Sequence, residues 1–494
     1  MHGYIAGIDI GTGSTKAAAF STDGSLLHTV QKHYTATYGT DGRSEQDPDE
    51  IGQAFLQCLQ ELTATLDAPL LAVGLSSAMH SLMAVDESGR PLMPLILWPD
   101  TRSADVAQAL HENGKAEALY RSTGTPVHAM SPLCKIIWLR QNKPGIFKQA
   151  AKFISIKEYI WWQLFGVYEV DESIASATGL FSVHELQWDT EALEEAGITA
   201  THLSLPVPVN LVRKKPLSHL PINLENVSFI IGASDGCLAH IGSGAKGFQT
   251  ASLTIGSSGA VRILCKEPVL RYPAMPFSYR LNRNDFVCGA AVNNGGLAAQ
   301  WLLKNFLGRE VLDEAGFRSL FHTLEQTNAG AEGLLFLPYL TGERAPVWDA
   351  KASALFVGIK PHHTQAHFVR AALEGICFAV KEVLQVLEEA AESVDAICVS
   401  GGFAQSPEWL QLLADVLEKP LTQSQTADAS ATGAAMLCLE AVNLSTENFI
   451  NPNKKETIIY PGENSNIYRH YFTLYQKLYP ALKEVMHGLY DFNT

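Results

Sequence analysis

The sequence predicts an α/β protein made of two related domains. Apolar strand-like runs alternate with helix-like stretches along the chain, which is typical of this fold class. A strand–turn–strand pattern also occurs twice, at residues 4–20 and again at residues 251–264. We therefore expect a mostly parallel sheet in each half, with one domain over residues 1–245 and the other over 246–494. Glycines at 242, 244 and 247 supply flexible positions at the boundary.

Length and composition support this interpretation. A chain of 494 residues favours two to four domains, and 47% hydrophobic residues are enough to build full-sized cores. Thirty-six Lys and Arg against 51 Asp and Glu give a net charge of −15. The longest basic run is Arg213-Lys214-Lys215, so we do not expect a nucleic-acid partner.

The cysteines and the N-terminus indicate a cytoplasmic protein. None of the eight cysteines forms a CxxC pair, and most lie within apolar runs, so we expect reduced, buried thiols. The first residues run directly into a strand without a basic, then apolar, leader. No apolar run approaches the ~20 residues that span a bilayer, so no membrane association is expected.

The remaining elements follow from local patterns in chain order. Residues 71–76 and 229–231 are continuous apolar runs that end in Gly/Ser turns, as buried strands do. Residues 103–110 and 150–165 have helical character. Residues 366–393 carry apolar side chains at spacings of three and four, which predicts one face of a long helix. The segment after residue 443 is expected to form a helical cap on the second domain.

The turn of the first hairpin has the composition of a phosphate-binding site. Gly11 and Gly13 allow a tight turn with accessible N–H groups, and hydroxyl side chains and Lys16 follow. Asp9 ends the first strand, where a carboxylate can hold hydrated Mg²⁺ beside a phosphate chain. The spacings GxxxxGK[ST] and GxGxxG are both absent, and an ordinary polar hairpin is the alternative. The acid and the duplicated hairpin favour phosphate binding.

The second hairpin turns through Gly256-Ser257-Ser258-Gly259, which is also small and rich in hydroxyls but carries no acid. This difference predicts that the first turn, which has the acid, binds metal and phosphate, and that the second turn contacts the phosphate from the opposite side. Elsewhere, the strand at 229–231 leads to Asp235 just before a helical stretch. A helix N-terminus favours an ionised carboxylate, which can act as a general base. Helix capping is the alternative role, and the local sequence leaves both open.

Three other strand ends carry candidate side chains. Gly401-Gly402 leaves bare backbone for a nucleotide, and Ser406 and Pro407 predict the N-cap and first residue of a helix. A second cluster places Met79 and His80 after a strand, although a lone histidine is more often structural. The third follows the apolar run 95–98 and consists of Trp98, Asp100 and Arg102.

Together these features resemble the FGGY carbohydrate kinases of the actin/Hsp70/sugar-kinase superfamily, over roughly residues 4–439. Residues 130–142, with Pro132, Lys135 and Trp138 in register, resemble the first family signature. Residues 354–359, 367–368 and 371–375 resemble the second. The resemblance implies two ribonuclease-H-like domains flanking a central cleft. There ATP, with Mg²⁺, would phosphorylate a terminal hydroxyl of a small sugar, sugar acid or polyol.

The resemblance also implies a role for each matched residue, and it implies a homodimer. Asp235 corresponds to the catalytic base and, with Asp9, would lie at Mg²⁺. The residues implied in nucleotide binding are Asp9, Thr12, Gly13, Ser14, Lys16, Ser257, Gly296, Gly401, Gly402 and Ser406. Those implied in substrate binding are Met79, His80, Trp98, Asp100, Arg102 and Asp235. Arg102 is the first candidate for a cation that faces a substrate carboxylate.

Within the family, two segments are most similar to gluconokinases. These are residues 76–82 and Ala233-Ser234-Asp235-Gly236, where xylulokinases tend to place Asn after the catalytic Asp. The implied reaction converts D-gluconate to 6-phosphogluconate; the alternative is a xylulokinase or another pentulose or polyol kinase. Ser353-Ala354 and Gln405 depart from the usual Arg-Gly and Lys or Arg. An actin- or Hsp70-like ATPase and a sugar-sensing regulator are alternatives from other classes.

Overall fold

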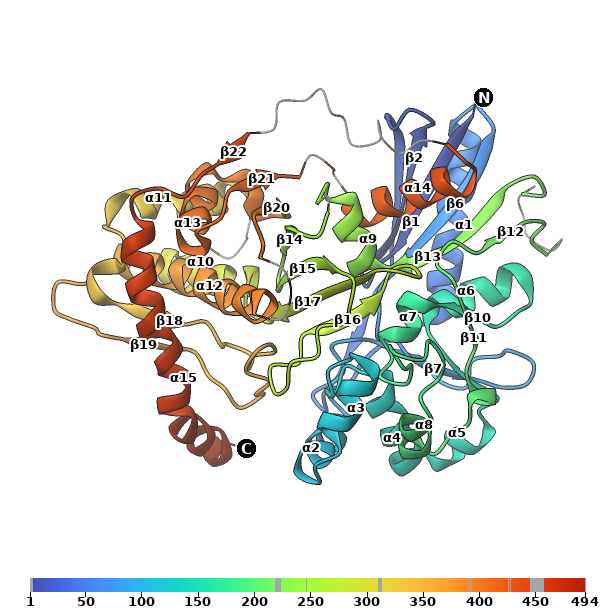
Figure 1. Ribbon diagram of the computed structural model, residues 1–494, viewed down its shortest axis with the longest axis horizontal. Coiled ribbons are helices and arrows are strands. Elements are labelled where there is room, and N and C mark those ends of the chain that lie inside the picture. Colours follow the sequence, from blue (N-terminus) through green and yellow to red (C-terminus); the bar gives the residue numbers. More distant parts are fainter. Residues whose placement is uncertain are drawn as a thin grey trace.

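Two mixed β-sheets form the centres of two α/β domains in the computed structural model of the chain (Figure 1). The structure describes residues 3–217, 224–245, 247–309, 313–389, 391, 393–424, 426, 428–444 and 457–493. The first domain lies on the right of Figure 1 and the second on the left. The predicted α/β class and its two domains are confirmed.

The two sheets have the following strands. The first runs in the order β12 (Val212–Arg213), β13 (Ser228–Ser234), β6 (Leu70–Ser77), β1 (Tyr4–Ile10), β2 (Ser14–Ser21) and β3 (Leu26–His33). The second runs in the order β16 (Phe277–Arg280), β17 (Phe286–Val292), β15 (Gly259–Cys265), β14 (Thr250–Ile255), β20 (Ala396–Ser400), β21 (Leu421–Gln423) and β22 (Ile458–Ile459).

The two sheets repeat one topology. In the first, β1 pairs antiparallel with β2 and parallel with β6, and β6 pairs parallel with β13. In the second, β14 pairs antiparallel with β15 and parallel with β20, and β20 pairs parallel with β21. The internal repeat inferred from the two hairpins is therefore real. The expectation of mostly parallel sheets is wrong, because the strands contributed by the hairpins are antiparallel and make each sheet mixed.

Helices cover both sheets. Those of the first domain's core include α1 (Pro48–Thr65) and α6 (Ile156–Phe165), and those of the second include α10 (Gly296–Leu307), α11 (Glu314–His322), α12 (Gln365–Glu388) and α13 (Pro407–Leu417). The helix expected over 366–393 is thus α12. The helix expected over 150–165 is shorter than predicted, because strand β9 (Lys152–Ile154) precedes α6. Ser155 follows the strand as the N-cap of α6, in a capping box with Glu158.

Smaller elements lie beneath the first sheet, at the lower right of Figure 1. The helices are α2 (Ala104–Glu112), α3 (Ala116–Thr123), α4 (Pro132–Asn142), α5 (Pro144–Gln149), α7 (Glu172–Ser176) and α8 (Thr190–Ala196). The short strands are β4 (Thr37–Tyr38), β5 (Ser44–Gln46), β7 (Met83–Val85), β8 (Leu95–Ile96), β10 (Glu169–Asp171) and β11 (Leu205–Val207). In the second domain β18 (Leu335–Leu337) pairs with β19 (Leu355–Val357).

Two helices meet where the domains join. Helix α9 (Asp235–Gly242) follows β13, and α14 (Ala429–Ala441) packs on α9 and on β1 and β6 of the first sheet, as Figure 1 shows. Glycines permit this close approach. A Cβ added at Gly7 would lie 1.8 Å from the Ala431 carbonyl oxygen, and one at Gly433 would lie 2.2 Å from that of Leu238. Even an alanine side chain would push α14 away from β1 at Gly7 and away from α9 at Gly433.

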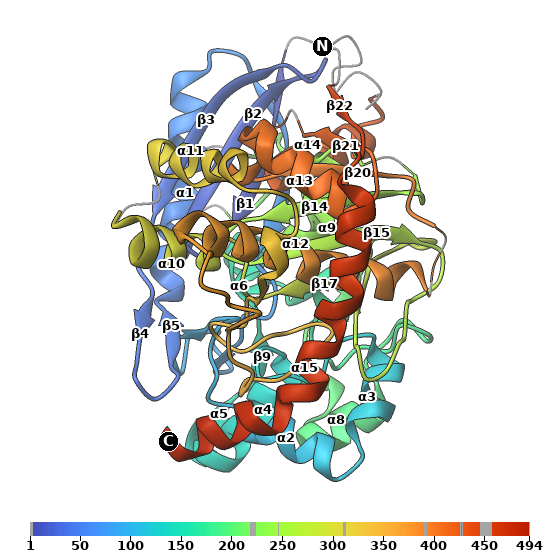
Figure 2. The ribbon, with the colours of Figure 1, turned by 90° about the vertical axis from the view of Figure 1, so that its left-hand side faces the viewer.

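The last helix, α15 (Ser465–Asn493), crosses the surface of the second domain (Figure 2). Tyr468, Phe472 and Tyr475 bury their rings against Phe378 of α12, so this part of the C-terminal segment caps the second domain as expected. All eight cysteines are buried, and none of them is in a disulfide. No helix among the described residues is both long and apolar enough to span a bilayer.

Candidate active site

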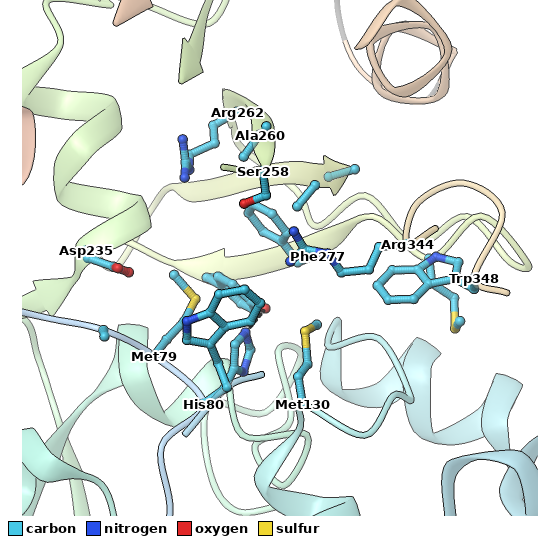
Figure 3. A pocket seen from close by; sticks show the side chains of 17 residues that line it. Met79, His80, Met130, Asp235, Ser258, Ala260, Arg262, Phe277, Arg344 and Trp348 are labelled. Carbon is cyan, nitrogen blue, oxygen red and sulfur yellow. Dashed lines mark hydrogen bonds between the residues drawn. The ribbon is translucent and has the colours of Figure 1, made fainter. Parts of the chain in front are cut away.

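A cavity of about 240 Å³ lies at the junction of the two domains. Its walls come from both of them: the ends of β6 and β13 on one side, and β15, β16 and β17 on the other. The lining residues are Ala78, Met79, His80, Trp98, Met130, Asp235, Ser258, Gly259, Ala260, Arg262, Met275, Phe277, Tyr279, Ala290, Ala291, Arg344 and Trp348. Figure 3 shows Asp235 and Met79 at one end of this cavity and Arg344 and Trp348 at the other.

Asp235 is the first residue of α9, and its carboxyl is available to a ligand. Ser234 is the N-cap, since its hydroxyl accepts a hydrogen bond from the Cys237 N–H. The alternative that Asp235 caps the helix is therefore excluded. Its Oδ1 accepts the N–H of Gly236 at 2.7 Å. Burial raises the pKa of Asp235, and the positive charge of Arg262 opposes that rise.

Asp9 lies at the end of β1, where its carboxyl meets two other acids. Ser76 of β6 donates a hydrogen bond to Asp9 Oδ1 at 2.6 Å. Burial and the charges of Asp428 and Asp235 raise the pKa of Asp9 to about 7. Lys16 lies opposite Asp9 in the hairpin, and its Nζ is 3.2 Å from Asp428 Oδ2. The first hairpin is thus tied to the N-cap of α14, through a residue that the sequence analysis did not select.

The turn of the first hairpin keeps open space beside its backbone. A Cβ added at Gly13 would meet no atom within 4 Å. The carbonyl groups of the turn point inward, since Gln46 Nε2 donates to the Thr12 carbonyl at 2.6 Å and Tyr34 donates to that of Gly11. The Ser14 hydroxyl accepts a hydrogen bond from Gln31 Nε2 at 2.8 Å. This geometry leaves room for an anion at Gly13, as a phosphate loop requires.

The second hairpin turn is fixed against the start of α10. The Gly256 carbonyl accepts the N–H of Gly296 at 2.7 Å, and the Ser257 carbonyl accepts that of Leu297 at 3.0 Å. A Cβ at Gly296 would lie 2.5 Å from the Gly256 oxygen, so close packing alone requires glycine there. The Gly296 N–H is thus already bonded, whereas Ser257 is exposed at the tip of the turn.

Two of the predicted nucleotide residues line a second, larger cavity. Gly402 and Ser406 lie on its wall beside the start of α13, and residues of α11 form the opposite wall. Its volume is about 1010 Å³, which is ample for a nucleoside. Ser406 is the N-cap of α13 and Pro407 its first residue, as predicted. Gly401 has a φ of 100°, and a Cβ there would lie 2.3 Å from the Ile255 carbonyl oxygen.

Three predicted substrate residues line the junction cavity as expected. Met79 and His80 follow β6, and Trp98 follows β8. His80 Nδ1 lies 2.8 Å from the Ala177 carbonyl oxygen and its Nε2 lies 3.1 Å from the Tyr279 hydroxyl. Burial lowers the pKa of His80 to about 3, so the ring is neutral. A neutral ring must donate from Nδ1 to the carbonyl, and its Nε2 then accepts from Tyr279 of the second domain.

Asp100 and Arg102 are placed differently from the other substrate candidates. Neither lines the junction cavity. The Arg102 guanidinium donates to both carboxylate oxygens of Asp100 and, at 2.7 Å, to Glu45 Oε1. It also lies 4.7 Å from the centre of the Trp138 ring. Its charge is therefore neutralised by two carboxylates, and the expected contact with a substrate carboxylate has no support in this arrangement.

The cations that do line the cavity are Arg262 on β15 and Arg344, neither of which the sequence analysis selected. Arg262 lies on the same face of its strand as Ser258 and Ala260, so period-two alternation from the second turn would have found it. Arg344 belongs to the segment 342–346, between β18 and β19. Its Nε donates to Asn293 Oδ1 at 2.7 Å, and its guanidinium lies 5.5 Å from the Trp98 ring centre.

Comparison with known proteins identifies the family to which the chain belongs. The sequence model of the N-terminal domain of the FGGY family of carbohydrate kinases matches residues 4–242, and that of the C-terminal domain matches residues 251–442. The chain belongs to this family.

Several relatives of this FGGY kinase are known. It is 37% identical to a gluconokinase from Bacillus subtilis, over 89% of this chain and 88% of that protein. It is 28% identical to a xylulose kinase from Staphylococcus xylosus, over 96% and 99% of the two chains. The crystal structure of a gluconate kinase from Lactobacillus acidophilus superimposes with a TM-score of 0.93 at 31% identity and covers 98% of both chains.

The residues present in this FGGY kinase fit a hydrated Mg²⁺. The charges of Asp428 and Asp235 raise the cost of ionising the Asp9 carboxyl, which a bound cation would relieve. Among the described residues, no three His, Cys, Asp or Glu side chains converge on one point as a complete metal site. Mg²⁺ usually keeps several waters and takes one or two carboxylates together with phosphate oxygens, and Asp9 and Asp235 would supply those carboxylates here.

Proposed function

We propose that the protein transfers the γ-phosphoryl group of ATP to the terminal hydroxyl of D-gluconate, with Mg²⁺, in the junction cavity. The charge of that cavity carries the proposal. Although the whole chain has a net charge of −15, its sugar-sized cavity contains two arginines, Arg262 and Arg344. A neutral sugar needs no such charge, whereas a sugar acid brings a carboxylate that guanidinium groups bind well. The higher identity to a gluconokinase than to a xylulose kinase supports the same substrate.

The proposed mechanism depends on positioning. Asp235 would accept a hydrogen bond from the terminal hydroxyl and take its proton as the new P–O bond forms. The turns at Gly13 and Ser257 would contact the phosphate chain with N–H and hydroxyl donors, and the nucleoside would lie in the cavity beside Gly402 and Ser406. Mg²⁺ near Asp9 would neutralise charge that develops on the phosphate oxygens.

A cavity between two domains can also shield the reacting groups from water. Water can compete with the sugar as acceptor and waste ATP, so a phosphotransferase gains from excluding it. Met79, Met130, Met275, Phe277 and Trp348 supply apolar walls around the polar groups. Buried free cysteines suit a reducing compartment, and we propose the cytoplasm as the location.

A substrate panel tests the proposal. Purified protein is assayed for ADP release with ATP, Mg²⁺ and one acceptor at a time: D-gluconate, D-xylulose, D-ribulose or glycerol. We expect the highest kcat/KM with gluconate and a product phosphorylated on the terminal hydroxyl, identified by phosphorus NMR. A higher kcat/KM with D-xylulose than with D-gluconate would show that the ketose, and not gluconate, is the preferred substrate. ADP release that does not depend on any acceptor would contradict a sugar kinase altogether.

A further inference from the structure

Arg262 is a guanidinium inside the cavity with unused hydrogen-bonding capacity. Its only hydrogen bond to a described residue runs from Nη1 to Thr254 Oγ1, at a long 3.3 Å. Its Nε is buried without a partner among the described residues. Burial lowers the pKa of this guanidinium, and the charge of Asp235 only partly offsets the effect. A buried guanidinium with unpaired donors is stabilised when an anion enters the cavity and accepts hydrogen bonds from it.

Gly236 creates the space that Arg262 occupies. This glycine is the second residue of α9, next to Asp235. A Cβ added there would lie 2.7 Å from Met79 Cε and 3.3 Å from Arg262 Nε. With only hydrogen at this position, the guanidinium and the thioether both reach the start of the helix. Any larger residue at 236 would have to displace one or both of them.

The position of Arg262 along β15 separates it from the phosphate turn. Ser258, Ala260 and Arg262 alternate onto the cavity face of the strand, and Figure 3 shows them along one side of the cavity. Five strand residues after Ser257 correspond to roughly 16 Å along the backbone. The guanidinium therefore lies beside Gly236 and near Asp235 at the start of α9, away from the tip of the turn.

Arg344, the other cation of the lining, already has fixed partners. Its Nε donates to Asn293 Oδ1, and its Nη2 donates to the Val292 carbonyl at 3.1 Å. The adjacent Glu343 places a carboxyl beside it, and Asn293 N–H is bonded to that carboxyl. The Arg344 guanidinium is thus fixed by hydrogen bonds within the cavity wall, whereas Arg262 has N–H donors available for a bound anion.

We propose that Arg262 is the specificity-determining residue that binds the carboxylate of the sugar acid, and that Gly236 admits its guanidinium to the cavity. This inference rests on the proposed function, because it assumes an anionic sugar in the junction cavity. It assigns recognition of that anion to β15 of the second domain, while the proton acceptor Asp235 comes from the first. A sugar acid would then be held by both domains at once.

Direct binding tests the inference with a matched pair of ligands, D-gluconate and D-glucitol, which differ by carboxylate against hydroxymethyl. Calorimetry without nucleotide gives the Kd of each for the unsubstituted protein and for Arg262→Gln. A charge-assisted pair of hydrogen bonds corresponds to an affinity loss of about 10- to 100-fold. We expect that loss for gluconate and a change below about threefold for glucitol. Arg262→Lys should recover part of the loss, because it keeps the charge but not the paired geometry.

Two further variants complete the design. Gly236→Ala keeps every charge but puts a methyl group against Met79 and Arg262, so it should also weaken gluconate binding more than glucitol binding. Arg283→Gln removes a cation outside the junction cavity and controls for the change in net charge; it should leave both Kd values unchanged. Thermal unfolding of each variant separates loss of folding from loss of binding.

The outcomes distinguish the inference from the proposed function. Unchanged gluconate affinity in Arg262→Gln would overturn the inference, even if the unsubstituted protein phosphorylates gluconate. The inference would also be overturned if Arg262→Gln lowered kcat equally with gluconate and xylulose and left KM unchanged. That result would indicate that Arg262 contacts the transferred phosphoryl group and not the sugar carboxylate. If the unsubstituted protein prefers another sugar acid, and Arg262→Gln loses affinity for that acid, the inference stands and gluconate is replaced.

Discussion

Replacement of Asp235 by Asn isolates the role of one carboxylate charge. Asn has nearly the same shape, and its side-chain oxygen can still accept the Gly236 N–H that Asp235 Oδ1 accepts at 2.7 Å. Helix α9 keeps its cap, because the cap is Ser234. The Gly402 cavity is a separate feature of the second domain, so nucleotide binding should persist. The substitution therefore removes a proton acceptor and a negative charge near Asp9 and Arg262, and it leaves the shape of the helix start unchanged.

The expected loss follows from that isolation. A positioned general base contributes about 10²- to 10⁴-fold to a rate. At about 1.36 kcal/mol per factor of ten, this corresponds to roughly 3–5 kcal/mol of activation free energy. Asp235 is the only carboxylate among the described lining residues of the cavity, so no neighbouring acid of the lining can replace it. We expect kcat with gluconate to fall by about three orders of magnitude while the Kd for ATP changes less than about threefold.

The assay measures ADP release at saturating ATP and gluconate, with ATP binding measured separately by calorimetry. Thermal unfolding with and without ATP confirms that the variant is folded and binds nucleotide. Turnover within threefold of the unsubstituted protein would refute the base role of Asp235. Loss of ATP binding in parallel with turnover would instead indicate that the carboxylate acts mainly through the metal and phosphate chain.

Four other substitutions test close packing, a buried carboxyl and an ion pair by thermal unfolding. Gly7→Ala should destabilise the protein by about 1–3 kcal/mol, because the added Cβ would meet α14. Gly13→Ala is the control, and it should be near neutral because there is open space beside Gly13. Equal losses of stability in the two variants would contradict the packing at Gly7. Burial raises the pKa of Glu382 to about 7, so its ionisation costs stability as pH rises from about 4.5 through 7. Glu382→Gln should raise the unfolding midpoint by about 2–4 °C at pH 8 and scarcely at pH 5; a larger gain at pH 5 would contradict this. Arg102→Met leaves the buried Asp100 carboxylate without its guanidinium partner, so it should lower the free energy of unfolding by about 3–5 kcal/mol. The KM for the sugar should change little. A raised KM at unchanged stability would indicate that Arg102 contacts the substrate.

Local patterns were sufficient to predict the features that depend on neighbouring residues. The two hairpins, the N-cap at Ser406 and helix α12 all follow from turn chemistry or apolar spacing within a short window. The capping ambiguity at Asp235 could not be settled in this way, since Ser234 and Asp235 are both good caps. Only the structure shows which hydroxyl or carboxyl accepts the Cys237 N–H.

Features that depend on contacts distant in sequence were missed. The charge of Arg102 is neutralised partly by Glu45, which lies far from it in the chain. Asp428 meets Lys16 only because α14 returns to the first sheet. Alternation along the predicted strand places Arg262 on the face of Ser258, but its closeness to Gly236 of the other domain could not be predicted from that strand. No pattern within one segment contains these relationships, because each joins residues that lie far apart in the sequence.

A crystal structure with D-gluconate and a non-hydrolysable ATP analogue tests the central claim most directly. The account predicts the sugar in the cavity between β6 and β15, with its terminal hydroxyl within about 3.2 Å of the Asp235 carboxylate and pointing toward the γ-phosphate. Its carboxylate should contact Arg262. A closed complex in which the Asp235 carboxylate lies far from both the terminal hydroxyl and the γ-phosphate would contradict the account.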